Sequence, residues 1–146
     1  MGVTIKSPNS SIDVSYGGFY RLRSGIARMI SAEFGEAYDT LFDHPSADEE
    51  KAIVEQLNCM IAEYETAHGN ALDPVFEFLF ASDTDGALGC AGCVTLKKLI
   101  CADPQKRSKL EALLIGYAGW ERPATGADFM CLLNECVRER RALKWF

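Results

Sequence analysis

Two arginines near the start of the chain have the spacing of an anion site. Arg21 and Arg28 are seven residues apart, so on a helix they share one face, with Ser24 between them. Guanidinium groups bind phosphates and carboxylates through paired hydrogen bonds. Two glycines precede them and would leave free backbone amides at the start of that helix, where an anion is favoured. We therefore predict a ligand-binding site formed by Gly17, Gly18, Arg21, Ser24 and Arg28.

A purely structural interpretation of the same residues stays open. The segment between residues 31 and 90 holds fourteen acidic side chains and one lysine. Both arginines can form ion pairs with this segment, because helix arginines usually have such partners. In that case the glycines only turn the chain into the helix.

The acidic segment is a second candidate surface. An acidic surface commonly keeps a small protein in solution. It disfavours direct binding of duplex nucleic acid, because phosphate backbones are held by Lys and Arg. Clustered carboxylates also resemble phosphates electrostatically and suit a basic partner protein. The partner-binding candidates in this segment are Glu49, Glu50 and Glu55.

The end of the chain carries a basic patch followed by two aromatic residues. The basic side chains between residues 138 and 144 fit the last turn of a helix, where cations complement the helix dipole. The two terminal aromatics either fold back onto the core or anchor a homodimer, because aromatic and arginine side chains are enriched at interface centres. The partner-binding candidates here are Arg138, Arg141, Trp145 and Phe146.

No motif in the chain specifies a reaction. Asp83, Asp85 and Gly86 match part of a calcium loop, but the first ligand and the bidentate carboxylate of that motif are missing. Cys90 and Cys93 form a C-x-x-C pair, which is two ligands short of a zinc site and leaves metal binding there undecided. The chain contains neither a catalytic triad motif nor a Gly-rich nucleotide fingerprint. We predict no catalytic residues, no metal site and no cofactor, and hence a protein that is not an enzyme.

The elements that must position these residues are mostly helical. Residues 1–18 alternate apolar and polar side chains around a turn, which predicts a short β-hairpin or arm. From Phe19 to residue 41, apolar spacings of three and four predict one long helix or two, with a kink near residues 31–35. Ser46, three residues before a glutamate, has the spacing of a capping box and predicts a helix over residues 47–67.

Four later helices follow from caps and apolar spacing. Asp73-Pro74 and Asp103-Pro104 each supply an N-cap and a first-turn proline. A short helix carrying residues 93–100 lies between these two. The last helix begins at Thr125, and its apolar face reaches Leu143.

Length and composition indicate one folded domain. The chain has 146 residues, of which 48% are hydrophobic and 25% charged, as in ordinary globular proteins. No apolar run is long enough to span a membrane, and the first residues lack the order of a signal peptide. Without a secretion signal, the six cysteines are expected to stay thiols. We predict a mostly α, compact single-domain bundle of five to seven helices over residues 1–146, located in the cytoplasm.

Three stretches of the chain carry a resemblance to known sequences. Residues 11–23 (SIDVSYGGFYRLR), 83–86 (DTDG) and 128–146 resemble a group of small uncharacterised proteins of phages and mobile elements of Gram-positive bacteria. The resemblance covers about a quarter of the chain and implies no role for any single residue. It implies a context, the bacterial host cell, in which small phage proteins often bind and inhibit host defence proteins.

Three functional hypotheses follow. The leading one is a non-catalytic, counter-defence binding protein that inhibits a host protein through its charged surface. The second is a sponge or sensor for a phosphate-bearing small molecule or nucleotide, held by the predicted arginine site. The third is a structural or regulatory homo-oligomer that uses Trp145 and Phe146.

Overall fold

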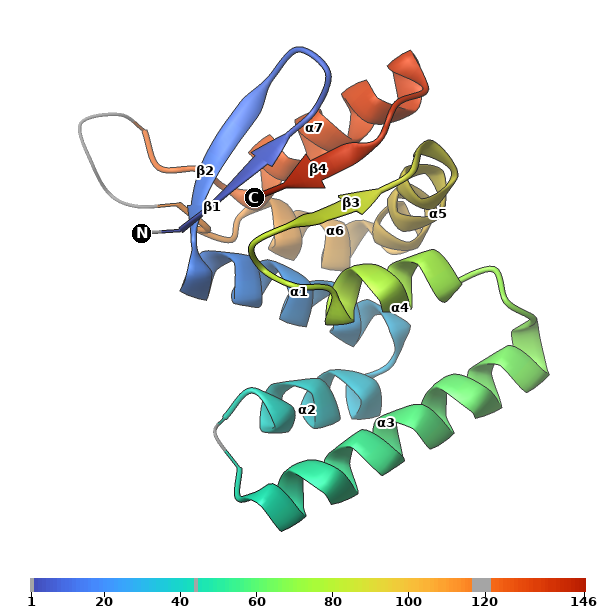
Figure 1. Cartoon of the computed structure of the whole chain (residues 1–146). Coiled ribbons are helices and arrows are strands. Elements are labelled where there is room, and N and C mark those ends of the chain that lie inside the picture. The colour runs from blue at the N-terminus through green and yellow to red at the C-terminus, as the bar shows by residue number, and fades with distance from the viewer. Residues whose placement is uncertain (1, 44, 117–121) are drawn as a thin grey trace.

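The computed structural model describes residues 2–43, 45–116 and 122–146, which form seven helices and four strands. Figure 1 shows the sheet and α7 at one end of the molecule and α2 and α3 at the other, with α1 and α4 between them. The prediction of a mostly helical chain is confirmed. In chain order the elements are β1 (Gly2–Lys6), β2 (Ser11–Ser15), α1 (Tyr16–Ile30), α2 (Ala32–Leu41), α3 (Ala47–His68), α4 (Asp73–Phe80), β3 (Gly86–Leu88), α5 (Cys90–Cys101), α6 (Pro104–Glu111), α7 (Gly126–Glu139) and β4 (Leu143–Trp145).

The predicted N-terminal hairpin is half of a four-stranded antiparallel sheet. β1 and β2 pair from Gly2 opposite Ser15 to Lys6 opposite Ser11, which confirms the hairpin. The strand order is β2-β1-β4-β3, so two three-residue strands extend it. The prediction of a short hairpin alone therefore understated the sheet. Strands this short have little stability alone and depend on their neighbours.

The predicted helical end of the chain is wrong beyond Glu139. Arg140 adopts a left-handed conformation with φ 57° and ψ 45°, and its N–H bonds to the carbonyl of Cys136. This conformation ends α7, because a residue in the left-handed region closes the last helical turn. Leu143 and Trp145 then pair with β3, and Trp145 also pairs with Ile5 of β1.

The predicted kink separates α1 from α2. Ser31 is extended, with φ −165° and ψ 158°, and its Oγ accepts a hydrogen bond from the N–H of Phe34. Ser31 therefore ends one helix and caps the next. α2 folds back along α1, and a Cβ added at Gly35 would lie 2.3 Å from Cγ of Arg28. The missing side chain at Gly35 lets these two helices pack closely.

Side-chain caps begin three further helices where the sequence predicts them. Ser46 caps α3, Asp103 caps α6, and Thr125 forms a capping box with Asp128 at α7. At α4 the N-cap position is occupied by Leu72 rather than the predicted Asp73, and no side chain caps that helix. Pro74 lies in the first turn of α4, as predicted.

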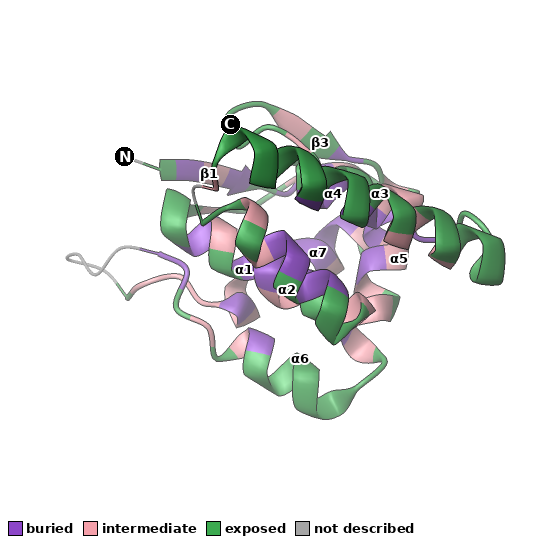
Figure 2. Ribbon diagram, turned by 90° about the horizontal axis from the view of Figure 1, so that it is seen from below, coloured by how far each residue is buried: buried purple, intermediate pink, exposed green. Residues whose placement is uncertain are grey.

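The core lies between the sheet and the helices that cover it. Figure 2 shows buried residues on the inner sides of α1, α2, α5 and α7. Aromatic side chains from three distant segments meet there: Phe78 of α4 contacts Phe19 of α1 and Trp145 of β4 with edge-to-face geometry. These contacts join the two ends of the chain to its middle.

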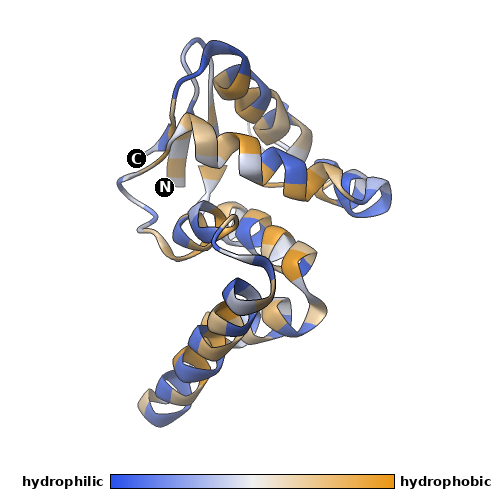
Figure 3. Ribbon diagram, turned by 90° about the vertical axis from the view of Figure 1, so that its right-hand side faces the viewer, coloured by the Kyte–Doolittle hydropathy of each residue, from blue (hydrophilic) through white to orange (hydrophobic). Residues whose placement is uncertain are grey.

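α3 is the least buried of the long helices. Of its 22 residues, only Ile53 and Leu57 are buried. α3 is the lowest helix in Figure 1. Figure 3 shows hydrophilic and hydrophobic residues mixed along it. Tyr64 reaches Phe76 of α4, with ring centroids 6.0 Å apart.

Among the described residues, no helix has both the length and the apolar composition needed to cross a membrane.

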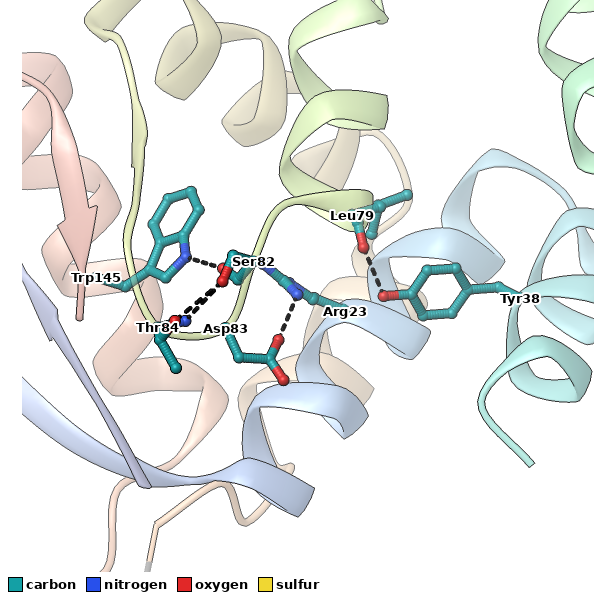
Figure 4. Close-up of polar contacts among 7 residues, drawn as sticks. All are labelled: Arg23, Tyr38, Leu79, Ser82, Asp83, Thr84 and Trp145. Atoms are coloured by element: carbon teal, nitrogen blue, oxygen red, sulfur yellow. Dashed lines mark hydrogen bonds and ion pairs between the residues drawn. The ribbon is translucent and has the colours of Figure 1, made fainter. Parts of the chain in front are cut away.

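A buried arginine lies at the centre of this packing. The side chain of Arg23 is 3% exposed, and its Nη1 lies 2.8 Å from Oδ1 of Asp83 (Figure 4). Its guanidinium lies over the ring of Phe19, 4.0 Å from the centroid, and close to the rings of Phe78 and Trp145. Burial lowers the pKa of Arg23, and Asp83 opposes this shift. An arginine stays charged under such conditions, so the fold needs the Asp83 carboxylate.

We expect Asp83→Asn to lower the free energy of unfolding by about 1–3 kcal/mol, because a buried charge loses its counter-charge. Urea unfolding, followed by far-UV circular dichroism, measures this change. Asp85→Asn, an exposed position two residues along the same loop, is the matched control. Equal stability of the two variants would contradict the role of Asp83.

A second buried charge fastens the hairpin to α7. The Glu135 carboxylate accepts hydrogen bonds from the N–H of Asn9 and from Oγ of Ser10, which lies 3.1 Å away. The Asn9 N–H, followed by serine hydroxyls, lowers the pKa of Glu135 below its usual value. A carboxyl with a depressed pKa stabilises the fold above its ordinary pKa and loses that contribution as the pH falls through the depressed value.

Glu135→Gln should therefore destabilise the protein most near neutral pH. Below about pH 4, near the ordinary pKa of glutamate, the variant and the unmodified chain should approach the same free energy of unfolding, because the carboxyl of Glu135 takes up its proton. Urea unfolding at a series of pH values measures this, with Glu77→Gln at an exposed position of α4 as the control. A gap that stays constant down to pH 2 would rule out the carboxylate as its cause.

Candidate functional site

A cavity opens between α1, α2 and α6, and α1 packs against each of the other two helices. Figure 2 shows α6 on one side of α1 and α2, seen from below. The volume of the cavity is about 540 Å³, which is within the usual range for small-molecule sites. The sequence-predicted Arg21, Ser24 and Arg28 all line it, one turn apart along α1. The structure thus brings these three predicted residues together at one concave site.

The charge of this cavity is strongly positive. Among the described residues, four cationic side chains line it, against one carboxylate, that of Asp39 from α2. Asp39 forms an ion pair with Arg28. The cationic lining residues are Arg21, Arg28, Lys106 and Lys109.

Asp39 organises the α2 side of the cavity. Its Oδ1 accepts hydrogen bonds from the Tyr20 hydroxyl at 2.8 Å and from Oγ of Ser24 at 2.5 Å, while its Oδ2 pairs with Arg28. Burial raises the pKa of Tyr20, with Arg28 acting in the opposite direction. Tyr20 therefore remains a neutral donor, and one carboxylate fixes three side chains of α1. The ion pair between Arg28 and Asp39 also fits the structural interpretation of the sequence, in which an arginine of this helix pairs with the acidic segment.

Arg21 is held by backbone rather than by a carboxylate. Its Nε and Nη2 donate to the carbonyl of Leu114, at 3.2 and 2.9 Å. Leu114 in turn forms an isolated bridge with Thr125, the N-cap of α7. The guanidinium is therefore positioned by the fold while its charge is not neutralised by this contact.

Two lysines of α6 complete the cationic lining, and sequence reasoning missed them. Lys106 and Lys109 are three residues apart, so they share one face of a helix that Asp103 and Pro104 begin. Both are exposed, as expected of long side chains at the mouth of a cavity. The run of basic residues from 106 to 109 was a visible signal, but nothing in the sequence placed it opposite Arg21.

Apolar groups also line the cavity. Met29 from α1 and Leu110 and Leu113 from the α6 region line it. Gly25 lies among them, and a Cβ there would meet Cδ1 of Leu110 at 3.0 Å. The site therefore combines cationic and apolar lining residues, the combination that orients an anionic ligand bearing an uncharged part.

The two predicted glycines do not line the cavity. The N–H of Gly18 donates to Oγ of Ser15, which caps α1. A Cβ on Gly18 would lie 1.8 Å from the carbonyl oxygen of Ile115, so this glycine permits close packing of the chain against the start of α1. Gly17 is exposed at the same helix end. The structure therefore gives Gly18 a packing role and leaves the predicted site to the side chains.

The acidic candidates lie elsewhere, on α3. Glu49, Glu50 and Glu55 are all exposed, and none lines the cavity. The ion pairs found among the described residues do not involve α3. Its carboxylates therefore face solvent.

The C-terminal candidates divide, and the prediction for Trp145 needs correction. Trp145 is 1% exposed, and its Nε1 donates to the carbonyl of Ser82 at 2.7 Å (Figure 4). It belongs to the core, so it cannot anchor a partner. Phe146 is 57% exposed, although its backbone pairs with Thr4. Arg138, which pairs with Glu139, and Arg141 are exposed at the far end of α7.

The structure also places the cysteines and the partial calcium motif. In the described part of the chain, no group of three or more metal-ligating side chains comes together. All six cysteines are free thiols. Burial raises the pKa of Cys93 and brings that of Cys136 to about 12, which leaves both thiols protonated and unreactive. No protein-family model matches the chain, and no curated protein or solved structure matches it either.

Proposed function

We propose that the protein is a non-catalytic binding protein that captures a phosphate-bearing small molecule in the cavity between α1, α2 and α6. The observation that carries this proposal is the convergence of four cationic side chains on one concave site of about 540 Å³. Arginine and lysine are the side chains that bind phosphate oxygens, and a partly enclosed site strengthens their attraction.

The positioning of the cationic groups supports binding. Arg21 is held by the Leu114 carbonyl and Arg28 by Asp39, so the rotamer entropy of both side chains is already lost before a ligand arrives. The lining contains a serine hydroxyl, that of Ser24, but it donates to Asp39, and no histidine or cysteine is found among the described residues that line the cavity. Such a lining favours capture of a ligand, as a sponge or sensor, over nucleophilic chemistry.

The test is a thermal-stability screen against nucleoside mono-, di- and triphosphates. A ligand present at 100 times its dissociation constant adds about 2.7 kcal/mol to the free energy of unfolding and raises the Tm. Ala32→Trp, which places a large ring in the cavity lining at an exposed first-turn position of α2, should abolish the shift. Ala62→Trp, on the exposed side of α3, should keep it.

Two results would overturn this proposal. One is the absence of a Tm shift with every phosphate compound tested. The other is an equal shift in Ala32→Trp and the unmodified chain, since the ligand would then bind outside the cavity.

The acidic face of α3 supports a second candidate function, docking onto a basic partner protein. α3 carries six acidic residues and one lysine, and all seven are exposed. In the phage context that the resemblance implies, the partner would be a host defence protein, and the complex would inhibit it. Electrostatic complementarity of this kind raises association rates and weakens with salt. The acidic residues of α3 are Asp48, Glu49, Glu50, Glu55, Glu63 and Glu65.

Charge reversal tests the α3 face. A variant with Glu49, Glu50 and Glu55 all changed to Lys should lose a host protein that co-purifies at low salt. The same three residues changed to Gln should give an intermediate loss, because neutralisation removes attraction without adding repulsion. Asp85→Lys, on an exposed loop outside α3, is the control. Retention of the partner by the triple Lys variant would contradict docking through α3.

A further inference from the structure

The charges of the cavity do not balance one another. Asp39 is matched by Arg28, with which it forms an ion pair. Arg21, Lys106 and Lys109 remain, and none of them forms an ion pair with another described residue. Three like charges at one site repel one another and create a positive potential that favours the binding of anions.

The uncompensated charges are not spread evenly around the site. Lys106 and Lys109 both come from α6, and Arg21 projects from the part of α1 whose neighbour is Leu114, just beyond α6. Arg28 is already engaged at the α2 side. The α6 side therefore attracts anions, whereas the α2 side is close to neutral.

The α2 side offers an aromatic surface instead. Tyr20 lines the cavity, and its hydroxyl is fixed by Asp39. Its ring packs against Tyr38 in a stacked arrangement and against Phe42, with centroids 6.3 and 5.5 Å apart. A ring held in this way is suited to contact a planar or ring-shaped part of a ligand at little entropic cost. Met29 and Leu113 continue the apolar lining.

We propose, as a deepening of the phosphate-binding function above, that the cavity takes a nucleoside polyphosphate. Its phosphate chain, which carries more negative charge than a single phosphate group, lies against Arg21, Lys106 and Lys109, and its ring system lies towards Tyr20. A monophosphate leaves part of the cationic cluster unmatched. A neutral nucleoside has no charge for the lysines to attract. An inorganic polyphosphate has no ring to contact Tyr20.

Isothermal titration calorimetry tests this with defined probes. These are the mono- and triphosphates of adenosine, guanosine, cytidine and uridine, the four free nucleosides, and inorganic tripolyphosphate, all in metal-free buffer. We expect at least one nucleoside triphosphate to bind about tenfold or more tightly than its monophosphate, and the nucleosides not to bind.

Three variants assign the two ends of the ligand. Lys106→Ala combined with Lys109→Ala should weaken the binding of the triphosphate about tenfold or more. It should also reduce the difference in affinity between the triphosphate and the monophosphate. Lys97→Ala combined with Lys98→Ala removes the same charge from α5, outside the cavity, and should change little. Tyr20→Leu should weaken the binding of the nucleoside triphosphate and leave the affinity for tripolyphosphate unchanged. Unchanged binding of tripolyphosphate also shows that this variant is folded.

The outcomes separate this inference from the function on which it rests. Equal binding of mono- and triphosphates, blocked by Ala32→Trp, would overturn the polyphosphate inference and leave phosphate capture intact. Equal binding of tripolyphosphate and every nucleoside triphosphate would overturn the assignment of the ring to the Tyr20 side. Binding of none of the probes would overturn both proposals.

Discussion

The fold depends on the burial of one guanidinium group. Arg23 enters the core from α1, receives the Asp83 carboxylate from the loop after α4, and lies among aromatic rings that include Trp145 of the last strand. Two of its nitrogens, Nε and Nη2, find no hydrogen-bond partner among the described residues. A buried cation held mainly by one carboxylate and ring faces is costly to expose and costly to strip of its partner. It therefore ties three distant segments to one arrangement.

That constraint also orients the candidate site. The face of α1 that contains Leu22, Arg23 and Ile26 is buried, so the remaining face of the same helix must look outwards. Arg21 and Arg28 lie on that outer face, where α2 and α6 close around them. A helix with one face fixed in the core is a rigid base for a binding site, and rigid bases hold charged groups in place before the ligand arrives. The site is thus positioned by core packing, which it meets at Leu110.

The charges that the sequence separates along the chain are also separated in space. The acidic α3 packs against α2 through a narrow apolar stripe and turns its carboxylates to solvent, while the cationic cavity opens between α1, α2 and α6. The two signs meet within the cavity at Asp39, which neutralises Arg28 and so leaves the α6 side as the positive one. Most of the acidic segment does not neutralise the arginines. A small molecule and a partner protein therefore have different surfaces available to them.

The sequence by itself determined the helices and the face on which Arg21, Ser24 and Arg28 lie. Caps and apolar spacing are local, and residues three to seven apart are neighbours on any helix, whatever surrounds it. Only the tertiary structure decided that Lys106 and Lys109 join Arg21, because a residue of α6 meets α1 through packing across some eighty positions of sequence. The same holds for β3 and β4, whose three residues each gain stability only from paired strands, and for Trp145, whose position in the core depends on Arg23 and Ser82. Contacts between residues far apart in the sequence leave no local pattern, so the spacing of residues along the chain does not predict them.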